Sequence, residues 1–161
     1  TSAMWTHLNK KSSIQYCVIK GGAGETDLEQ DSILVNGSWL NNSRGGGIYI
    51  NAARGLLKHN SILRNDALTG GGLFIVNSPI VQLSENEINE NFAEITGAGV
   101  SSVNSILELM NNLIMSNNSS RDDLRGLTSF EGIIKLLGNN SIQGMNCMHG
   151  TLEVVGLNTI K

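Results

Sequence analysis

Apolar and polar residues alternate in short runs along much of this chain. The clearest runs are the stretches 48–50, 73–75 and 107–109, in which two aliphatic residues flank an aromatic or charged one. A period of two over a few residues predicts half-buried β-strands. No segment sustains the i, i+3, i+4, i+7 apolar stripe that is typical of an amphipathic helix. We therefore expect an all-β protein made of short strands.

The strands recur within a longer repeat, the phrase L-x-x-N-x-I-x-x-N. It begins at Leu57, Leu83 and Leu109, spaced 26 residues apart. Looser copies begin at positions 14, 33, 137 and 155, so the first Asn position holds, in order, Cys17, Asn36, Asn60, Asn86, Asn112, Asn140 and Asn158. Such a period is typical of a solenoid. We expect about seven coils of about three strands each. Lys135 and Glu153 fall at apolar positions of the repeat, so a bulge or a shifted marker is expected there.

Glycine and asparagine mark the expected corners. Gly-rich triplets at 45–47, 70–72 and 97–99 each precede a strand, and glycine adopts the positive φ that a tight corner requires. The repeated Asn also lies at a bend, and Asn tolerates the left-handed conformation better than most residues. Stacked Asn side chains hydrogen-bond along a solenoid as an amide ladder. We therefore expect Asn60, Asn86 and Asn112 to be buried and stacked about 4.8 Å apart.

Two other solenoids have comparable repeats. A leucine-rich repeat has a period of about 20–29 residues, but it requires Leu where Asn60, Asn86 and Asn112 stand. A left-handed β-helix advances in hexapeptide steps, which spacings of 24 and 26 residues do not sustain. Both alternatives fit the pattern less well than a right-handed coil.

The motifs IQYCVIKGG, GGGIYIN and GGGLFIVNS, together with the N-x-I-x-x-N phrases, resemble those of the right-handed parallel β-helix family. This family includes pectate-lyase-like enzymes, tailspikes and many adhesins. The resemblance covers residues 12–160 and implies an all-β, right-handed parallel β-helix solenoid, without implying an activity. The Gly-rich corners also resemble the repeats of polymorphic outer-membrane and autotransporter passenger proteins. Those repeats carry a Phe-x-x-Asn motif, whereas Asn occupies the Phe position here.

Composition narrows the classes of function. The chain has 161 residues, 40% of them hydrophobic and only 4% aromatic, so the core must be aliphatic. The net charge of −3 and the lack of a basic run give no indication of nucleic-acid binding. No apolar stretch approaches the roughly 18 residues of a membrane span. No cofactor motif is present, and His7, His59 and His149 lie too far apart in the coil order to suggest a metal site.

The two cysteines are expected to be free thiols. Cys17 lies in the first coil and Cys147 follows the sixth marker. Five steps of about 4.8 Å separate them by about 24 Å, beyond the roughly 7 Å that a disulfide spans between Cα atoms. We expect Cys17 to be buried as a small apolar residue.

The chain is expected to be a single domain over residues 1–161 and an excerpt of a longer solenoid. The first strand pattern, 4–8, begins almost at once, and the last copy of the repeat reaches Lys161. Natural solenoids cover their ends, because an open edge promotes aggregation. We therefore expect flanking coils, or end-to-end contact with a partner, and association when the chain is made alone.

A charged run offers one candidate site. Arg121, Asp122, Asp123 and Arg125 lie in the longest step of the repeat and are expected to form a loop. In the β-helix family, lyases use acidic Ca²⁺ ligands with a basic residue, and hydrolases use paired carboxylates. Those residues come from several stacked coils, however, whereas this run is local. A solvated charged loop is the favoured interpretation, and no catalytic residue is assigned.

Residues 26 positions apart should lie over one another on neighbouring coils, which predicts two pairs of polar side chains. His59 should lie over Glu85, and Arg64 over Glu90, either as a polar binding strip or as ordinary charge pairs of about 0.2–1 kcal/mol. The charge pairs are favoured.

Two aromatic residues form another candidate binding surface. Tyr49 and Phe74 are the outward residues of successive strands. If their rings are exposed, they would bind the faces of sugar rings. The favoured interpretation is that the two rings stack on each other and stabilise the neighbouring strands. Glycosylation sequons occur at Asn36, Asn41, Asn117, Asn118 and Asn139, and the repeat makes Asn36 and Asn117 poorly accessible.

Two hypotheses of function follow. The first is a non-enzymatic solenoid module of a surface or extracellular protein, acting in adhesion, binding or scaffolding, with a polysaccharide or another protein as partner. The second is a polysaccharide lyase or glycoside hydrolase, as the family resemblance implies. Charged residues converging across three or more coils would favour the enzyme, and the sequence places at most two in one column.

Overall fold

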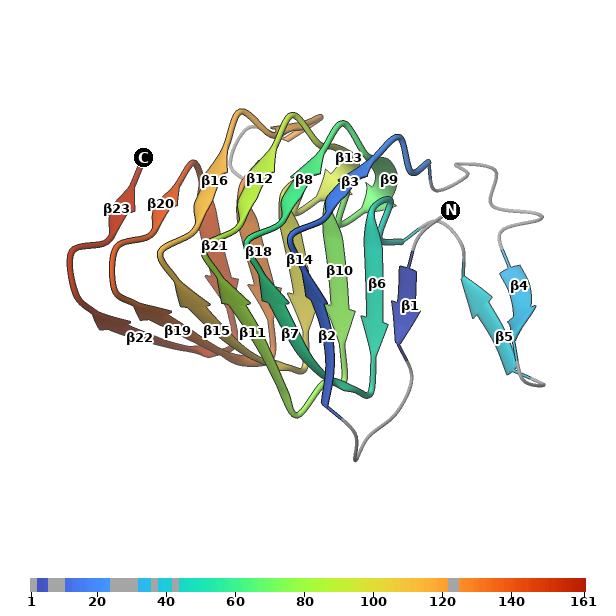
Figure 1. Ribbon diagram of the computed structural model, residues 1–161, viewed down its shortest axis with the longest axis horizontal. Helices are drawn as coiled ribbons and strands as arrows, with labels where there is room; N and C mark the ends of the chain where they lie inside the picture. The colour runs from blue at the N-terminus through green and yellow to red at the C-terminus, as the bar shows by residue number, and fades with distance from the viewer. Residues whose placement is uncertain (1–2, 6–10, 24–31, 36–37, 42–43, 122–124) are drawn as a thin grey trace.

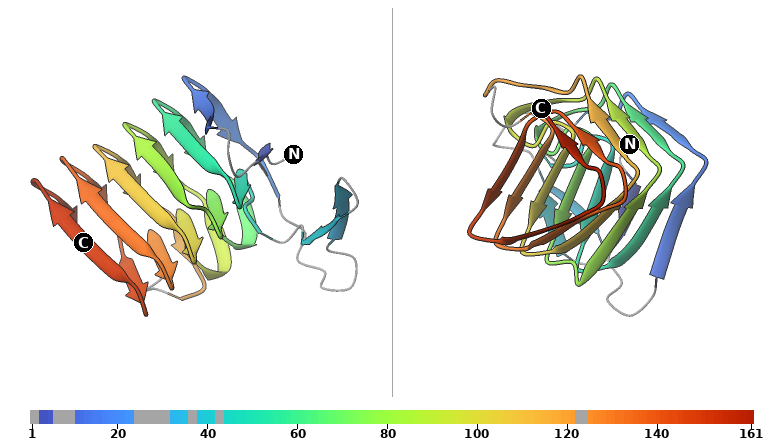
Figure 2. Two further views of the ribbon diagram at one scale, coloured as in Figure 1. Left: turned by 90° about the horizontal axis from the view of Figure 1, so that it is seen from below. Right: turned by 90° about the vertical axis from the view of Figure 1, so that its left-hand side faces the viewer.

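Short parallel strands stack into a coil in the computed structural model, which describes residues 3–5, 11–23, 32–35, 38–41, 44–121 and 125–161 (Figure 1). Three parallel sheets, here named A, B and C, form the sides of the coil, and each has six strands within the described residues. Successive rungs follow one another along the long axis (Figure 2). The parallel β-helix expected from the repeat is therefore confirmed.

Each sheet takes one strand from every rung. In the order of the rungs, sheet A contains β1 (Ala3–Trp5), β6 (Ile48–Asn51), β10 (Leu73–Val76), β14 (Val100–Val103), β18 (Leu127–Phe130) and β21 (Met145–Met148). Sheet B contains β2 (Lys11–Gln15), β7 (Arg54–Lys58), β11 (Ile80–Ser84), β15 (Ile106–Met110), β19 (Ile133–Leu137) and β22 (Thr151–Val155). Sheet C contains β3 (Val18–Lys20), β8 (Ser61–Leu63), β12 (Glu87–Asn89), β16 (Leu113–Met115), β20 (Ser141–Ile142) and β23 (Thr159–Ile160).

A fourth side is present in the middle rungs, where three strands per coil were expected. Sheet D contains the strands β9 (Asp66–Thr69), β13 (Phe92–Thr96) and β17 (Asn118–Ser119). After β20 the chain turns at Gln143 and Gly144 and enters β21 directly. The wall made by sheet D therefore ends before the last rungs.

The core consists of aliphatic columns inside the coil. In sheet C the inward column is a single isoleucine repeated in every rung: Ile19, Ile62, Ile88, Ile114, Ile142 and Ile160. In sheet A one inward column contains Ile50 and Ile75 and continues with Ser102 and Ser129. These two serine hydroxyls are buried, and within the described residues they have no hydrogen-bond partner.

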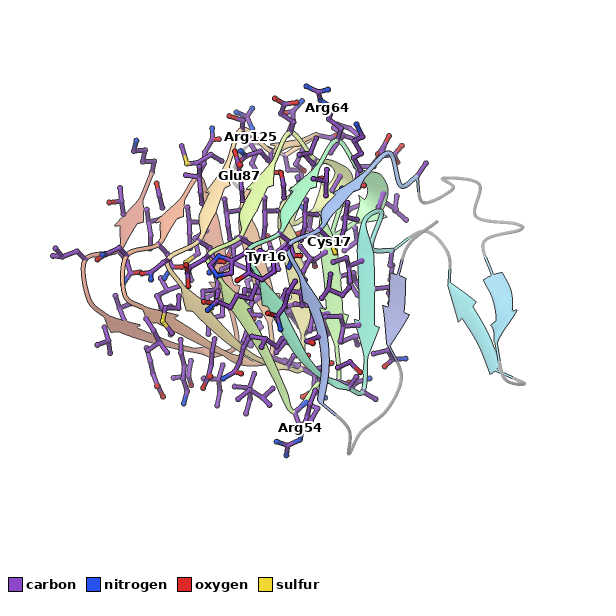
Figure 3. All side chains as sticks on the ribbon, in the orientation of Figure 1. Tyr16, Cys17, Arg54, Arg64, Glu87 and Arg125 are labelled. Carbon is purple, nitrogen blue, oxygen red and sulfur yellow. The ribbon has the colours of Figure 1, made fainter. Side chains whose placement is uncertain are left out.

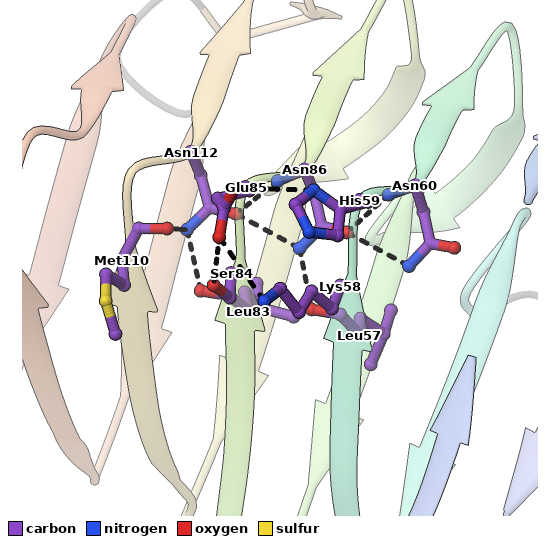
Figure 4. Close-up of polar contacts among 10 residues, drawn as sticks. All are labelled: Leu57, Lys58, His59, Asn60, Leu83, Ser84, Glu85, Asn86, Met110 and Asn112. Atoms are coloured by element: carbon purple, nitrogen blue, oxygen red, sulfur yellow. Dashed lines mark hydrogen bonds and ion pairs between the residues drawn. The ribbon is translucent and has the colours of Figure 1, made fainter. Parts of the chain in front are cut away.

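Buried asparagines form a ladder at the bend between sheets B and C (Figure 4), which confirms the expectation for Asn60, Asn86 and Asn112. The Asn86 side chain donates through Nδ2 to Asn112 Oδ1 at 3.1 Å and to the carbonyl of Leu57 at 2.9 Å. Its own Oδ1 accepts from the backbone N–H and the Nδ2 of Asn60, each at 3.0 Å. The ladder continues through Asn140 to Asn158.

A second ladder occupies the bend after sheet C. It uses the second Asn of the phrase, in Asn65, Asn91 and Asn117. All three are at most 3% exposed, so the low accessibility expected for Asn117 is confirmed, whereas Asn36 lies outside the described residues. The two ladders together satisfy the backbone N–H groups that each bend would otherwise leave unpaired.

The positive φ expected at Asn60, Asn86 and Asn112 is found one residue earlier in the sequence. His59, Glu85 and Asn111 have φ between 54° and 57°. The side chain of each ladder Asn is thereby directed inward, while the residue before it adopts the strained φ. At the Gly-rich corners, Gly45, Gly70 and Gly97 have positive φ, as expected.

Close backbone approach explains the other glycines of these corners. A Cβ at Gly71 would lie 2.0 Å from the carbonyl oxygen of Phe92. Only glycine fits where sheet D meets the corner that leads into sheet A.

The looser copy at residues 33–41 is not a coil. β4 (Ser32–Val35) and β5 (Ser38–Asn41) form an antiparallel hairpin, which pairs with no other described strand. The chain leaves the coil after Ala23 and returns at Arg44, and both residues bridge to the same strand, β9. Cys17 and its ladder partner Asn60 are 43 residues apart because this hairpin lies between them in the sequence. This accounts for six strands in each of sheets A, B and C, where about seven coils were expected.

The irregularity expected near residue 139 is also present. Leu136 pairs with Leu109 and lies in the core, so one extra residue precedes Asn140. Gly138, with φ 73°, absorbs the insertion at this bend. Lys135 consequently points outward rather than into the core, and its Nζ lies 3.9 Å from Glu108 and 3.7 Å from Glu153 on the neighbouring strands. The expectation of at most two charged residues in one column is therefore wrong, because these three stack across three rungs.

None of the described residues belongs to a helix that is long and apolar enough to cross a membrane.

Candidate functional site

A groove lies on the outer face of sheet A, and its origin is a change of residue size along one column. Phe74, Ser101 and Thr128 occupy equivalent outward positions of β10, β14 and β18, following Tyr49 of β6. After Met4 of β1, the next two rungs place aromatic rings in this column, and the two that follow carry small hydroxyl side chains. The groove, with a volume of about 380 Å³, lies where the rings stop.

The rings of Tyr49 and Phe74 stack on each other, with centroids 5.7 Å apart and planes 10° from parallel. The expectation that they are exposed is wrong: Tyr49 is 9% and Phe74 2% exposed. Their ring faces are therefore unavailable as a sugar-binding platform, and the cross-strand stack is the interpretation that the geometry supports.

The rim of the groove is largely apolar. Val103, Phe130 and Met148 occupy a second outward column, two residues beyond the first. On the opposite side, the pairing of β13 with β9 shifts register between Ala93 and Thr96, which places Ile95 at the rim. Ile95 is 46% and Phe130 38% exposed. β-Bulges commonly redirect a side chain in this way.

Two arginines border the groove. The Arg44 guanidinium lies 5.2 Å from the centroid of Phe74, within cation–π range. Arg121 is exposed and lines the groove next to sheet D. Burial raises the pKa of the Tyr49 hydroxyl above its usual value, and the charge of Arg44 partly opposes this rise. The described lining therefore carries an arginine at each margin, with apolar and hydroxyl residues between them.

Hydroxyl groups with no hydrogen-bond partner among the described residues line the groove, including those of Thr128 and Thr96. Thr128 is 3% exposed, and its Oγ1 forms no hydrogen bond within the described part of the chain. The half-buried Thr96 Oγ1 is in the same situation. An unpaired buried hydroxyl costs about 1–3 kcal/mol, so a donor or acceptor brought by a ligand would be favoured here.

The charged pairs predicted from the 26-residue spacing are present. His59 Nδ1 lies 3.4 Å from Glu85 Oε2, and Arg64 Nε lies 2.6 Å from Glu90 Oε2. Lys58 also contacts Glu85 at 3.6 Å (Figure 4), and the exposed ring of Tyr16 stacks on His59 at 4.8 Å. These are cross-rung contacts of the kind that modestly stabilise neighbouring strands.

The two pairs do not converge on one site. Figure 3 shows Tyr16 near the centre of the coil and Arg64 at its upper edge. Neither pair lines the groove on sheet A.

The charged loop is only partly within the described residues. Asp122 and Asp123 lie outside them, and Arg121 is the member that reaches the groove. Arg125 precedes β18 and is half-buried. Within the described part of the chain, no group of three or more His, Cys, Asp or Glu residues is placed to hold a metal ion.

Both cysteines are free thiols, as expected. Cys17 is exposed, however, so the expected burial is wrong. It occupies the ladder position of the first rung, where its backbone N–H donates to Asn60 Oδ1, and its side chain lies at the edge of the ladder. Among the sequons, Asn118 and Asn139 are exposed.

Sequence reasoning missed the groove-lining residues Ser101, Thr128 and Ile95. A signal was present, because the outward position after each Gly-rich corner changes from Tyr49 and Phe74 to Ser101. The bulge at Glu94 and Ile95 left no recognisable mark on the alternation.

The family described as "Right handed beta helix region" matches residues 5–155. No curated protein and no solved structure matches the chain.

Proposed function

The chain belongs to the right-handed β-helix family, and we propose that it is a non-enzymatic binding module of a surface or extracellular protein. In this proposal the groove on sheet A receives part of a partner molecule, and the regular coil serves as its rigid support. The observation that carries the proposal is the buried hydroxyl of Thr128, which has no partner among the described residues and lines a groove of arginines, hydroxyl residues and apolar residues. Extracellular placement rests on the resemblance of the Gly-rich corners to passenger repeats.

The chemistry of the lining supports binding rather than turnover. The described residues around the groove are arginines, hydroxyl residues and apolar residues, and none of them is Asp, Glu, His, Cys or Lys. General acid–base catalysis needs a group that exchanges protons near neutral pH, whereas arginine stays protonated and Ser or Thr needs an activating base.

A polysaccharide lyase or glycoside hydrolase is the second candidate. One observation favours it: Arg121 lines the groove and is followed directly in the sequence by Asp122 and Asp123. A basic residue beside two carboxylates is compatible with either Ca²⁺-assisted elimination or acid-catalysed hydrolysis.

A paired screen separates the two candidates. The immobilised chain is probed with a glycan array and with an array of extracellular proteins, and acidic polysaccharides are assayed for cleavage with and without Ca²⁺. We expect binding without cleavage, weakened at least tenfold in the double variant Arg44→Ala, Arg121→Ala. Lys20→Ala, Lys161→Ala serves as the matched control, because both lysines lie outside the groove. Cleavage products that disappear when Asp122 and Asp123 are changed to Asn would establish the enzyme instead.

A further inference from the structure

The outer face of sheet B carries three columns of side chains that run across the rungs (Figure 1). The column on one side contains the half-buried Ile106 and Ile133. The middle column is polar and contains Gln82, Glu108, Lys135 and Glu153, and the column on the other side contains Ser84, Met110, Leu137 and Val155. Met110 is 45% and Val155 62% exposed. Exposed apolar side chains gathered on one face mark a site of protein association.

Charges of opposite sign alternate along the middle column. Lys135 Nζ lies 3.9 Å from Glu108 Oε1 and 3.7 Å from Glu153 Oε2. Gln82 Nε2 donates to Glu108 Oε2 at 2.9 Å. The order along the column is therefore amide, negative, positive, negative. A second copy of this column, turned end to end, matches the first when Glu108 meets the partner's Lys135 and Gln82 meets the partner's Glu153.

A single two-fold axis produces this match. The axis lies between β15 and β19, parallel to the strands, so that β15 faces β19 of the second copy and β11 faces β22. An axis along the coil would instead place each charge over its own copy. An axis through the rung of Lys135 would place Lys135 over itself and Glu108 over Glu153. Both alternatives bring like charges together, which is strongly unfavourable at an interface.

The shape of the face agrees with the same axis. A hollow of about 230 Å³ lies over Ser84, whose small side chain stands between Lys58 and Met110 in its column. The two-fold axis places the exposed Val155 of the second copy opposite this hollow. It also places Met110 opposite Leu137 of the second copy, so that apolar side chains meet on this side of the charged column.

We propose that this chain forms a symmetric dimer through sheet B, with the two coils antiparallel. The apolar columns supply the attraction. The charged column sets the register, because an ion pair that loses water contributes more to specificity than to affinity. Four short strands of each copy overlap, which is at the small end of specific interfaces, so the dimer should dissociate at micromolar concentrations. This inference goes beyond the proposed function and does not depend on it, since no residue of sheet B lines the groove on sheet A.

Sedimentation velocity of the native chain and of two charge-reversal variants tests this dimer. Glu108→Lys brings positive charges together across the two-fold axis, and Lys135→Glu brings negative charges together. Each variant alone should dimerise at least about tenfold more weakly than the native chain. The two variants carry complementary columns, so their equimolar mixture should dimerise as the native chain does.

Matched variants on sheet C separate the interface from general effects of charge and size. Glu87→Lys and Lys20→Glu make the same charge changes at exposed positions and should dimerise normally. Ser84→Phe should fill the hollow and weaken the dimer, whereas Ser61→Phe should not. Circular dichroism melts check that each variant folds. All of these proteins keep the same last rung, so association at that end does not distinguish them.

The outcomes decide whether the dimer exists and how it is arranged. A native chain that stays monomeric up to millimolar concentration, or single variants that dimerise as well as the native chain, would overturn it. A mixture that stays monomeric although both variants are folded would contradict the antiparallel register. If the native chain is monomeric and a different protein binds it but not Ser84→Phe, sheet B serves that partner and the dimer is wrong. Failure of the groove to bind any ligand leaves these outcomes unchanged.

Discussion

Single amide side chains determine how this coil turns. The side chains of Asn86 and Asn112 both donate and accept along the stack, and they also bond backbone groups of the neighbouring rung. A residue of similar size without an amide group could fill the same space, but it could not make these hydrogen bonds. The burial of Asn86, at 2% exposure, therefore depends on a set of partners and not on its volume.

Replacing Asn86 with Leu should lower the free energy of unfolding by at least about 2 kcal/mol. The substitution removes the hydrogen bonds that the Asn86 side chain makes to the Asn60 N–H and to the Leu57 carbonyl, and each unsatisfied buried group costs about 1–3 kcal/mol. Urea denaturation measures the change. Glu87→Leu on the outer face of sheet C is the control, and equal stability of Asn86→Leu and the native chain would refute the role of the ladder.

The Tyr49 hydroxyl should make the protein sensitive to alkali. Its pKa is raised in the folded state, chiefly by burial, so the neutral form is the one that the fold favours. The associated stability is fully present below the ordinary value of 10.0 and is lost as the pH rises through the raised pKa. Unfolding by urea at a series of alkaline pH values should show this loss, and Tyr49→Phe should remove that part of it. The same pH profile in both proteins would contradict the assignment.

At the scale of elements, the corners and the sheet D wall create the groove. The wall exists because the chain adds β9, β13 and β17 between sheet C and the Gly-rich corner of the next rung. The register shift in β13 then brings Ile95 to the rim. Binding residues thus lie on strands that the coil holds in place, which favours a pre-organised site.

The hairpin β4–β5 should be dispensable for the coil. It pairs with no other described strand, and the residues on either side of the excursion, Ala23 and Arg44, bridge separately to β9. Replacing residues 30–42 with a short Gly-Ser linker should change the melting temperature by only a few degrees. Removing β12 to β13, residues 87–96, from the coil is the contrasting deletion and should unfold it. Loss of the cooperative melt on hairpin removal would show that these residues support the coil.

How much of this could be predicted from the sequence depends on whether a feature repeats. The ladder, the Gly-rich corners and the parallel sheets follow from residues that recur every 26 positions, such as Asn60 and Asn86. The hairpin was mistaken for a coil because residues 33–41 imitate the spacing of one repeat, and spacing alone cannot distinguish parallel from antiparallel pairing. The groove arises where Ser101 and Ile95 depart from the repeat, and the repeat pattern therefore cannot predict it.

In the whole molecule, the apolar core is open at the last rung, where no described residue covers it. Leu152, Val154 and Ile160 continue inward columns of sheets B and C, and they are 42%, 53% and 47% exposed. The outer edge of β22 also pairs with no described strand. Apolar surface beside an unpaired strand edge favours association with another β-structure.

A chain of residues 1–161 made alone should therefore self-associate as its concentration rises. Sedimentation velocity over a hundredfold range of concentration measures this. The variant Leu152→Lys, Val154→Lys should shift the distribution toward monomer, because it places charges on the exposed edge. Thr151→Lys, Thr159→Lys in the same last rung adds the same charge at outward positions and is the control for charge alone. A stable monomer at all concentrations would contradict the prediction.

Methyl NMR shows directly whether the groove on sheet A is where a partner binds. Ile95, Thr96, Thr128 and Met148 place methyl groups around the groove, whereas Ile62, Ile88 and Ile114 lie in the core of sheet C. Titration with a glycan or protein partner selected in the array screen should shift the groove methyls and leave the core methyls unchanged. Shifts centred on the Tyr16–His59–Glu85 contact, or spread evenly over the molecule, would contradict the claim.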